Sequence, residues 1–417
     1  MHTAQVLQSF AGFLALHVLS WLISERRWVI AWRTVVSGML LTLGLGLLLL
    51  KVPTVSELFL ALNNLVTVLE QATQHGTSFV LGYLGGGPLP YEETQPGASF
   101  IFATRALPLV IVVSALSSLL FYWRILPWIV RAFSLLLTRT MGVGGAIGLS
   151  SAANVFVGMV EAPLFVRPYI AKMSRSELFV MMTCGMATIA GTVMVLYASV
   201  LGKVIPDILG HLLIASIIST PAAIVVSILM VPPEGGLTEG ELVPSQQATS
   251  SMDAVTRGTI DGVALYINII AMLVVLVALV ALANYLLAFL PSLAENPITL
   301  QRILGWIMAP LVWVMGIPWS EAPTAGALMG TKTILNEFIA YLDLAALPQD
   351  SLSNRSELMM VYAMCGFANL GSLGIMIGGL TTMCPERREE IVSLGGKTIV
   401  SGTLATLIAG SVVGILY

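Results

Sequence analysis

Long apolar runs alternate with short polar segments along most of the 417-residue chain. A run of about 17 apolar residues or more can cross a bilayer roughly 30 Å thick as a helix. The pattern predicts eight spans, near residues 4–23, 34–50, 101–123, 177–201, 209–231, 262–290, 358–383 and 391–417. The first run lacks a basic leader and a small-residue cleavage site, so we expect it to be retained as a span.

Three further segments have a different pattern. Residues 54–74 place leucine and valine at helical spacing with polar residues opposite, which predicts an interfacial helix. Residues 141–170 and 305–342 are apolar but interrupted by glycine, proline and charge. Broken backbone at membrane depth is tolerated where it lines a cavity. We therefore predict an all-α polytopic membrane protein in which two segments do not cross as simple spans.

Composition agrees with the pattern and excludes several functions. Hydrophobic residues make up 57% of the chain and charged residues 10%, against roughly a quarter charged in soluble domains. No basic tract predicts binding to nucleic acid. The four histidines form no metal pair at helical spacing, and no HExxH or nucleophile–base motif is present, so an enzyme is not predicted.

Positive charge near the ends of the spans predicts their orientation. With eight spans, the basic clusters between the spans all fall on one side, which is predicted to be cytoplasmic. They comprise Arg26, Arg27, Arg33, Arg124, Arg131, Arg139, Arg167, Lys172, Arg175, Arg257, Arg387 and Arg388. Both termini are then on the non-cytoplasmic side, and the polar linker 232–257 is cytoplasmic.

Two segments of the sequence are similar to each other. SRSELFVMMTCGMAT (174–188) and NRSELMMVYAMCGFAN (354–369) share Arg-Ser-Glu-Leu and a Cys-Gly pair seven or eight residues after the glutamate. Upstream, each interrupted segment holds one glutamate, Glu161 in VEAPLF and Glu337 in NEFIAY. The two copies lie three crossings apart, so they point in opposite directions. Inverted repeats with broken segments indicate the binding site of a transporter.

The two glutamates allow two interpretations. Each could lie solvated at a membrane boundary without a function. Their matching places in two repeats favour a functional role instead. A carboxylate at bilayer depth costs about 2.5–3.5 kcal/mol on insertion scales, so it needs a partner or a water-filled cavity.

Polar residues near the repeated segments predict an ion site. Thr188 and Asn369 lie in the small-residue stretches TIAGT and ANLGS, and Asn154 lies within the first broken segment, 141–170. A threonine in a membrane helix commonly bonds only the carbonyl four residues earlier. Freed carbonyls with an asparagine oxygen and a threonine hydroxyl are, however, the hard ligands that hold Na⁺ in transporters.

The residues resemble a known family over nearly the whole chain. GTSF (76–79), SAANVFVG…EAPL (151–164), SELF (176–179), ATIAG (187–191), NEF (336–338) and CGFAN (365–369) occur in the order found in concentrative nucleoside transporters. The chain is similar to the bacterial, eight-span type. The resemblance implies two re-entrant helical hairpins, inverted repeats, and a mobile transport domain moving against a scaffold that forms a homotrimer in the inner membrane.

The resemblance also implies domain limits. The scaffold would comprise residues 1–140 and span six, 258–292. The transport domain would comprise 141–231, with hairpin one and spans four and five, and 293–417, with hairpin two and spans seven and eight. Residues 232–257 would link the two repeats.

Site residues follow from the resemblance position by position. Glu161 would face the nucleobase near Val193, and Glu337, Asn369 and Ser372 would bind the ribose. Phe367 and Leu265 would form apolar walls of the base pocket. Sodium would be held by the side chains of Asn154 and Thr188 and the carbonyls of Val157 and Ile189.

The chain departs from the family pattern at hairpin one. The family reads Gly-Gln-Thr-Glu or Gly-Gln-Ser-Glu, whereas this chain reads Gly158-Met159-Val160-Glu161. The side chains of Met159 and Val160 cannot hydrogen-bond a nucleobase. A pocket built to bond a polar group discriminates strongly and an apolar one does not, so we expect altered base selectivity.

The predicted function is import of nucleosides, or of nucleoside-like ribosylated compounds, by alternating access driven by the sodium gradient. Two alternatives remain. One is a proton-coupled carrier in which a glutamate titrates, although Asn154 and Thr188 favour sodium. The other is a non-transporting membrane sensor, which has no evident need for mirrored carboxylates.

Overall fold

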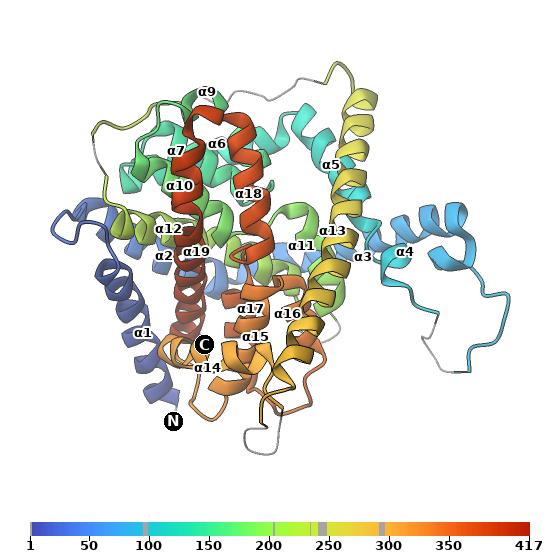
Figure 1. Cartoon of the computed structure of the whole chain (residues 1–417). Coiled ribbons are helices and arrows are strands. Elements are labelled where there is room, and N and C mark those ends of the chain that lie inside the picture. The colour runs from blue at the N-terminus through green and yellow to red at the C-terminus, as the bar shows by residue number, and fades with distance from the viewer. Residues whose placement is uncertain (1, 95–98, 203–204, 234, 241–247, 292–296) are drawn as a thin grey trace.

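A computed structural model describes residues 2–94, 99–202, 205–233, 235–240, 248–291 and 297–417 (Figure 1). The regular elements of this part are helical. The first half contains α1 His2–Leu22, α2 Trp32–Lys51, α3 Pro53–Leu81, η1 Gly82–Gly85, α4 Phe102–Arg105, α5 Leu109–Tyr122, α6 Ile125–Met141, α7 Gly145–Asn154, α8 Glu161–Leu164, α9 Arg167–Ile170, α10 Arg175–Ala187, α11 Gly191–Leu201 and α12 Ile208–Met230. The second half contains α13 Ser251–Leu287, α14 Leu300–Met315, α15 Ala322–Ile334, α16 Glu337–Ala345, α17 Asn354–Met364, α18 Leu370–Met383, η2 Pro385–Arg387 and α19 Arg388–Leu416.

Seven segments in the described part are long and apolar enough to cross a membrane, and they correspond to seven of the eight predicted spans. The eighth predicted span, 358–383, is present but is not one continuous helix. The segment is two helices, α17 and α18, separated by residues 365–369. Asn369 caps the second helix, since its side-chain oxygen accepts a 2.7 Å hydrogen bond from the Ser372 amide. The span 177–201 is divided in the same way into α10 and α11.

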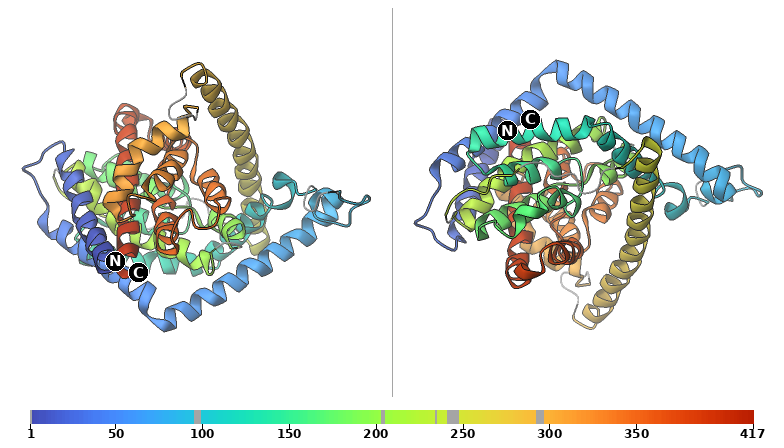
Figure 2. Two further views of the ribbon diagram at one scale, coloured as in Figure 1. Left: turned by 90° about the horizontal axis from the view of Figure 1, so that it is seen from below. Right: turned by 90° about the horizontal axis from the view of Figure 1, so that it is seen from above.

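Helix α3 is longer than the predicted interfacial helix, extending from Pro53 to Leu81 instead of 54–74. It runs along the outer edge of the molecule (Figure 2) and contacts α5, α11 and α12. This position agrees with a peripheral role, while its location at the membrane surface stays a prediction. The linker prediction needs one correction, because α13 begins at Ser251 and therefore includes the last residues of the segment 232–257.

The structure extends the repeat beyond the segments that the sequence indicated. Each repeat consists of a helix, a second helix, a broken hairpin, a broken helix and a final long helix. In the first repeat these are α5, α6, hairpin one (α7 to α9), α10 with α11, and α12. In the second they are α13, α14, hairpin two (α15 and α16), α17 with α18, and α19. Equivalent helices pack together, α5 against α13 and α12 against α19. The two chain ends lie at the same end of the molecule, as an even number of crossings requires (Figure 1).

Helices α1 and α2 pack mainly against helices of the predicted transport domain. Helix α1 contacts α19 and α12, and α2 contacts α12. Helices α5 and α13 instead contact each other extensively. The resemblance assigns spans one, two, three and six to the scaffold. In the structure, spans one and two pack on the predicted transport domain, whereas spans three and six pack on each other. The domain limits therefore stay a prediction.

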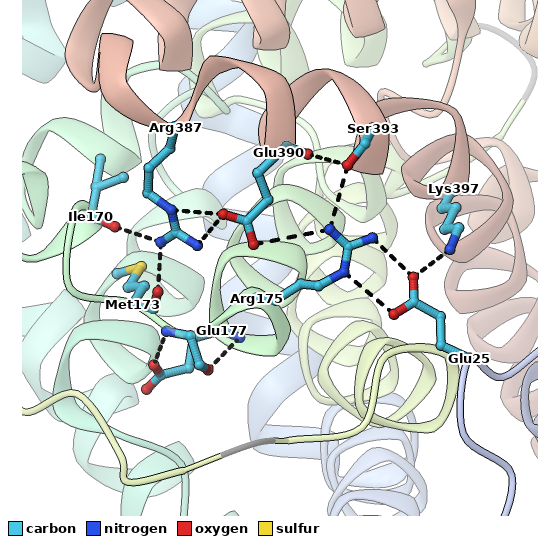
Figure 3. A network of polar contacts seen from close by, with 10 residues as sticks. Glu25, Ile170, Met173, Arg175, Glu177, Arg387, Glu390, Ser393 and Lys397 are labelled. Carbon is cyan, nitrogen blue, oxygen red and sulfur yellow. Dashed lines mark hydrogen bonds and ion pairs between the residues drawn. The ribbon is translucent and has the colours of Figure 1, made fainter.

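The arginines of the two Arg-Ser-Glu-Leu segments connect the N-terminal region to α19, Arg175 through Glu25 after α1 and Arg355 through Ser9 within α1. At one end, the Arg175 guanidinium pairs with Glu25 at 3.0 Å, and Lys397 of α19 pairs with the same carboxylate (Figure 3). The Arg175 guanidinium holds the pKa of Glu25 at about 2, so Glu25 stays ionised at neutral pH. At the other end, Arg355 donates to Ser9 of α1 at 2.8 Å and to the Gly414 carbonyl of α19 at 2.6 Å.

Candidate functional site

A cavity of about 180 Å³ lies where the two hairpins, the two broken helices and α13 meet. All nine residues predicted to bind substrate line this cavity. They are Met159, Val160, Glu161, Val193, Leu265, Glu337, Phe367, Asn369 and Ser372. Residues more than 200 positions apart are thus brought to one place by the mirrored elements. Their roles toward a ligand stay predictions.

The tip of hairpin one presents Glu161 to the cavity. Its carboxylate folds back over Gly158, where an added Cβ would lie only 2.0 Å from the Glu161 Oε2 atom. Only glycine leaves room for this arrangement. Glu161 is exposed in the single chain because it faces the cavity.

Glu337 in hairpin two has a different environment. It is 3% exposed and is the first residue of α16. The Tyr197 hydroxyl donates to its Oε1 at 2.5 Å, and the Asn369 amide donates to its Oε2 at 2.9 Å. Both oxygens are therefore fixed by side chains from α11 and from the cap of α18. This geometry leaves the remaining lone pairs of a positioned carboxylate available to a ligand with neighbouring hydroxyl groups.

Apolar side chains form the rest of the wall. Phe367 comes from the break between α17 and α18, Leu265 from α13 and Val193 from α11. Met159 is only 8% exposed. It packs closely on Gly185 of α10, where an added Cβ would lie 2.9 Å from the Met159 Cβ. Val160 is less buried and packs over Gly379 of α18. Of the two departures from the family pattern, Val160 therefore presents more surface to the cavity.

The two broken helices meet at their breaks. The Phe367 amide donates to the Thr188 carbonyl at 3.3 Å, and a Cβ on Gly366 would lie 2.8 Å from the Met186 carbonyl oxygen. The Gly191 amide donates to Phe156 of hairpin one at 3.2 Å. Backbone groups freed by each break are therefore partly satisfied by the opposite element, which explains why the chain can break inside the membrane.

The four predicted sodium ligands lie between hairpin one and the α10–α11 break. Asn154 is 1% exposed, and its Oδ1 has no hydrogen-bond partner among the described residues. The Thr188 hydroxyl donates to the carbonyl of Asn154 at 3.2 Å. It also donates to the Cys184 carbonyl at 2.9 Å, which is the bond to the carbonyl four residues earlier that a threonine in a membrane helix commonly makes. No described residue donates a hydrogen bond to the carbonyls of Val157 or Ile189.

These oxygens fit a small cation. A buried acceptor without a donor is uncommon in proteins, and the Oδ1 of Asn154 is such an acceptor. The Thr188 hydroxyl uses its proton on a carbonyl, which leaves its oxygen lone pairs available to a ligand. Oxygen atoms of this type are the ligands that hard cations prefer.

Three family models cover most of the chain. The N-terminal model of the Na⁺-dependent nucleoside transporters matches residues 11–84, and the C-terminal model matches residues 211–414. A nucleoside-recognition model matches residues 103–204. The chain belongs to the Na⁺-dependent nucleoside transporter family. It is 33% identical to the nucleoside permease NupC of Helicobacter pylori, over 98% of this chain and 97% of that protein.

Solved structures of this transporter family have the same fold. The chain matches CNTnw in an inward-facing substrate-bound state with a TM-score of 0.89 and 35% identity, over 99% of this chain and 97% of the other. It also matches a CNTnw variant in an outward-facing state, with a TM-score of 0.91 and 33% identity, over 99% and 98%. The predicted family and the helical fold with scaffold, transport domain and re-entrant hairpins are confirmed.

Sequence reasoning missed several polar residues of this transporter site. Tyr197, Asn268 and Asn336 also line the cavity. Tyr197 lies four residues after Val193 and Asn268 three residues after Leu265, so each shares a helical face with a predicted residue. Asn336 caps α16, its oxygen accepting from the Ile339 amide at 2.9 Å. Helical spacing from the predicted residues could have found the first two.

Proposed function

We propose that this chain imports nucleosides, or nucleoside-like ribosylated compounds, as a symporter driven by the sodium gradient. The observation that carries the proposal is one cavity that joins both mirrored glutamates and adjoins a buried set of oxygens without donors. The chain has the fold of transporters solved facing either side of the membrane, which supports alternating access.

The cavity supports a division of roles. Glu337 accepts the ribose hydroxyls in charge-assisted hydrogen bonds, with Asn369 and Ser372 beside it. The base lies between the apolar groups Phe367 and Leu265 and faces Glu161 at the tip of hairpin one. These assignments are proposals that combine the family resemblance with the observed positions of the side chains.

Sodium binds at Asn154, Thr188 and the carbonyls of Val157 and Ile189 in this proposal. The Phe156–Gly191 bond ties the tip of hairpin one, which carries Glu161, to the α10–α11 break beside Thr188. An ion that fixes this junction therefore favours the arrangement that binds the base. Because linkage is reciprocal, nucleoside binding must raise sodium affinity by the same factor.

The assembly and membrane topology belong to the same proposal. We expect a homotrimer in the bacterial inner membrane, with both termini on the non-cytoplasmic side. The mobile body comprises the two hairpins with spans four, five, seven and eight. Helices α1 and α2 pack on α12 and α19, so we expect α1 and α2 to move with this body.

The function is tested by uptake of labelled purine and pyrimidine nucleosides into proteoliposomes, in sodium and in choline at a fixed pH. We expect accumulation only with an inward sodium gradient. Full uptake in choline would contradict sodium coupling and favour the proton-coupled alternative. Absence of accumulation in every gradient, with binding retained, would favour the sensor.

Substrate selectivity follows from hairpin one. The double substitution Met159→Gln and Val160→Thr restores groups that hydrogen-bond a base. We expect the ranking of purine and pyrimidine nucleosides in a competition assay to change by roughly tenfold for at least one base, while sodium dependence is kept. Met159→Leu with Val160→Ile is the matched apolar control. An unchanged ranking in the polar double variant would show that these side chains do not read the base.

A further inference from the structure

Hairpin two contains a fully buried lysine. Lys332 lies in the last turn of α15 and is 0% exposed. Its Nζ atom has no hydrogen-bond partner among the described residues. A buried ammonium without acceptors is costly unless a charge compensates it. The position of Lys332 therefore indicates an electrostatic role.

The counterpart of this position in hairpin one belongs to the proposed sodium site. Helix α7 ends at Asn154 and leads to Glu161, as α15 carries Lys332 in its last turn and leads to Glu337. Both residues hold a buried polar atom without a partner in the described structure. Asn154 offers an acceptor oxygen, whereas Lys332 brings a positive charge of its own. The carbonyl end of a helix favours positive charge in both cases.

The second repeat does not offer the oxygens that the first one does. Asn369 is the repeat counterpart of Thr188. Its Oδ1 accepts from the Ser372 amide at 2.7 Å, and its Nδ2 donates to Glu337. Its side chain is therefore already engaged in capping α18 and in holding the carboxylate. A separate cation would find fewer free ligands here.

The positive charge of Lys332 interacts electrostatically with groups in and beside hairpin two. It acts on the Glu337 carboxyl group and on the Cys365 thiol, the counterpart of Cys184 beside hairpin one. Lys332 does not hydrogen-bond Glu337 directly. Tyr197 and Asn369 fix the two carboxylate oxygens, and Lys332 supplies a positive charge that acts on Glu337.

We propose that Lys332 is a positioning residue, a resident cation that takes in the second repeat the place that sodium takes in the first. It compensates the charge of the Glu337 carboxylate and helps to keep that carboxylate aimed at the ribose. This inference rests on the proposed function. It follows that the ribose half of the site carries its own cation, while the base half obtains one from solution.

The test measures ribose recognition apart from overall binding. Affinities for a nucleoside and for its 2′,3′-dideoxy analogue are determined at saturating sodium for the wild type, Lys332→Met and Lys332→Arg. We expect Lys332→Met to weaken nucleoside binding by at least about tenfold and to leave the dideoxy analogue nearly unchanged. Lys332→Arg, which keeps the positive charge, should recover part of the preference for the nucleoside over its dideoxy analogue. The exposed Lys172 provides the control, Lys172→Met. A preserved discrimination ratio in Lys332→Met overturns the inference.

A stability comparison covers the case in which Lys332→Met folds poorly. Removing both charges, in Lys332→Met with Glu337→Gln, should raise the Tm above that of either single variant. Additive losses would contradict the charge relation. If the wild type binds neither ligand, the proposed function fails, and the Tm comparison still decides whether Lys332 compensates Glu337.

Discussion

Glu337→Gln is expected to weaken nucleoside binding by at least about 100-fold, because hydrogen bonds to a charged group contribute about 1.5–3 kcal/mol each and two ribose hydroxyls are involved. Glutamine keeps the shape of the side chain and can still bond Tyr197 and Asn369. The loss therefore reports the charge and not the packing. The measurement is isothermal titration of the purified protein with a nucleoside and with its free base.

Two comparisons separate this effect from general damage. Glu357→Gln removes a carboxylate from the same repeat, in the first turn of α17 and outside the cavity, and should leave nucleoside affinity unchanged. The free base, which does not contact Glu337 in the proposed pose, should bind Glu337→Gln as it binds the wild type. Equal losses for base and nucleoside would show that Glu337 supports the pocket and does not read the ribose.

The sequence was sufficient to predict the spans that cross as continuous helices, because their hydropathy persists over the full bilayer thickness. It did not locate the break within 358–383, where Cys365, Gly366 and Phe367 are as apolar as a continuous helix requires. The break there is set by a partner far away in sequence, the Thr188 carbonyl. Hydropathy cannot report such a contact, although the repeat placed the two segments in corresponding positions.

The candidate site was predictable to the extent that polar residues are rare in apolar segments. Glu161, Glu337 and Asn154 stand out for that reason. Tyr197 does not, because it is read as part of an apolar helix until its hydroxyl is found 2.5 Å from Glu337. Lys332 was likewise visible in the sequence, but its meaning depends on burial and on the absence of a hydrogen-bond partner in the described structure.

Thr188→Val is expected to raise the sodium concentration for half-maximal stabilisation by about tenfold, equivalent to roughly 1.4 kcal/mol. Valine has the shape of threonine but removes the hydroxyl proposed as a sodium ligand. The measurement is the Tm as a function of sodium at constant ionic strength, with choline as replacement. At saturating sodium, nucleoside affinity should return close to that of the wild type, because the pocket residues are unchanged.

Thr183→Val is the matched control, in helix α10, which ends just before Thr188. Thr183 is also fully buried, but its hydroxyl bonds Ser401 at 2.7 Å instead of facing hairpin one. Its loss should lower the Tm without changing the sodium dependence, whereas Thr188→Val should change the dependence itself. If both variants shift only the Tm, the Thr188 hydroxyl is a local helix bond to Cys184 and sodium must bind elsewhere. If only Thr188→Val raises the sodium requirement, reciprocity demands a matching fall in the affinity for nucleoside at low sodium, a second measurement on the same sample.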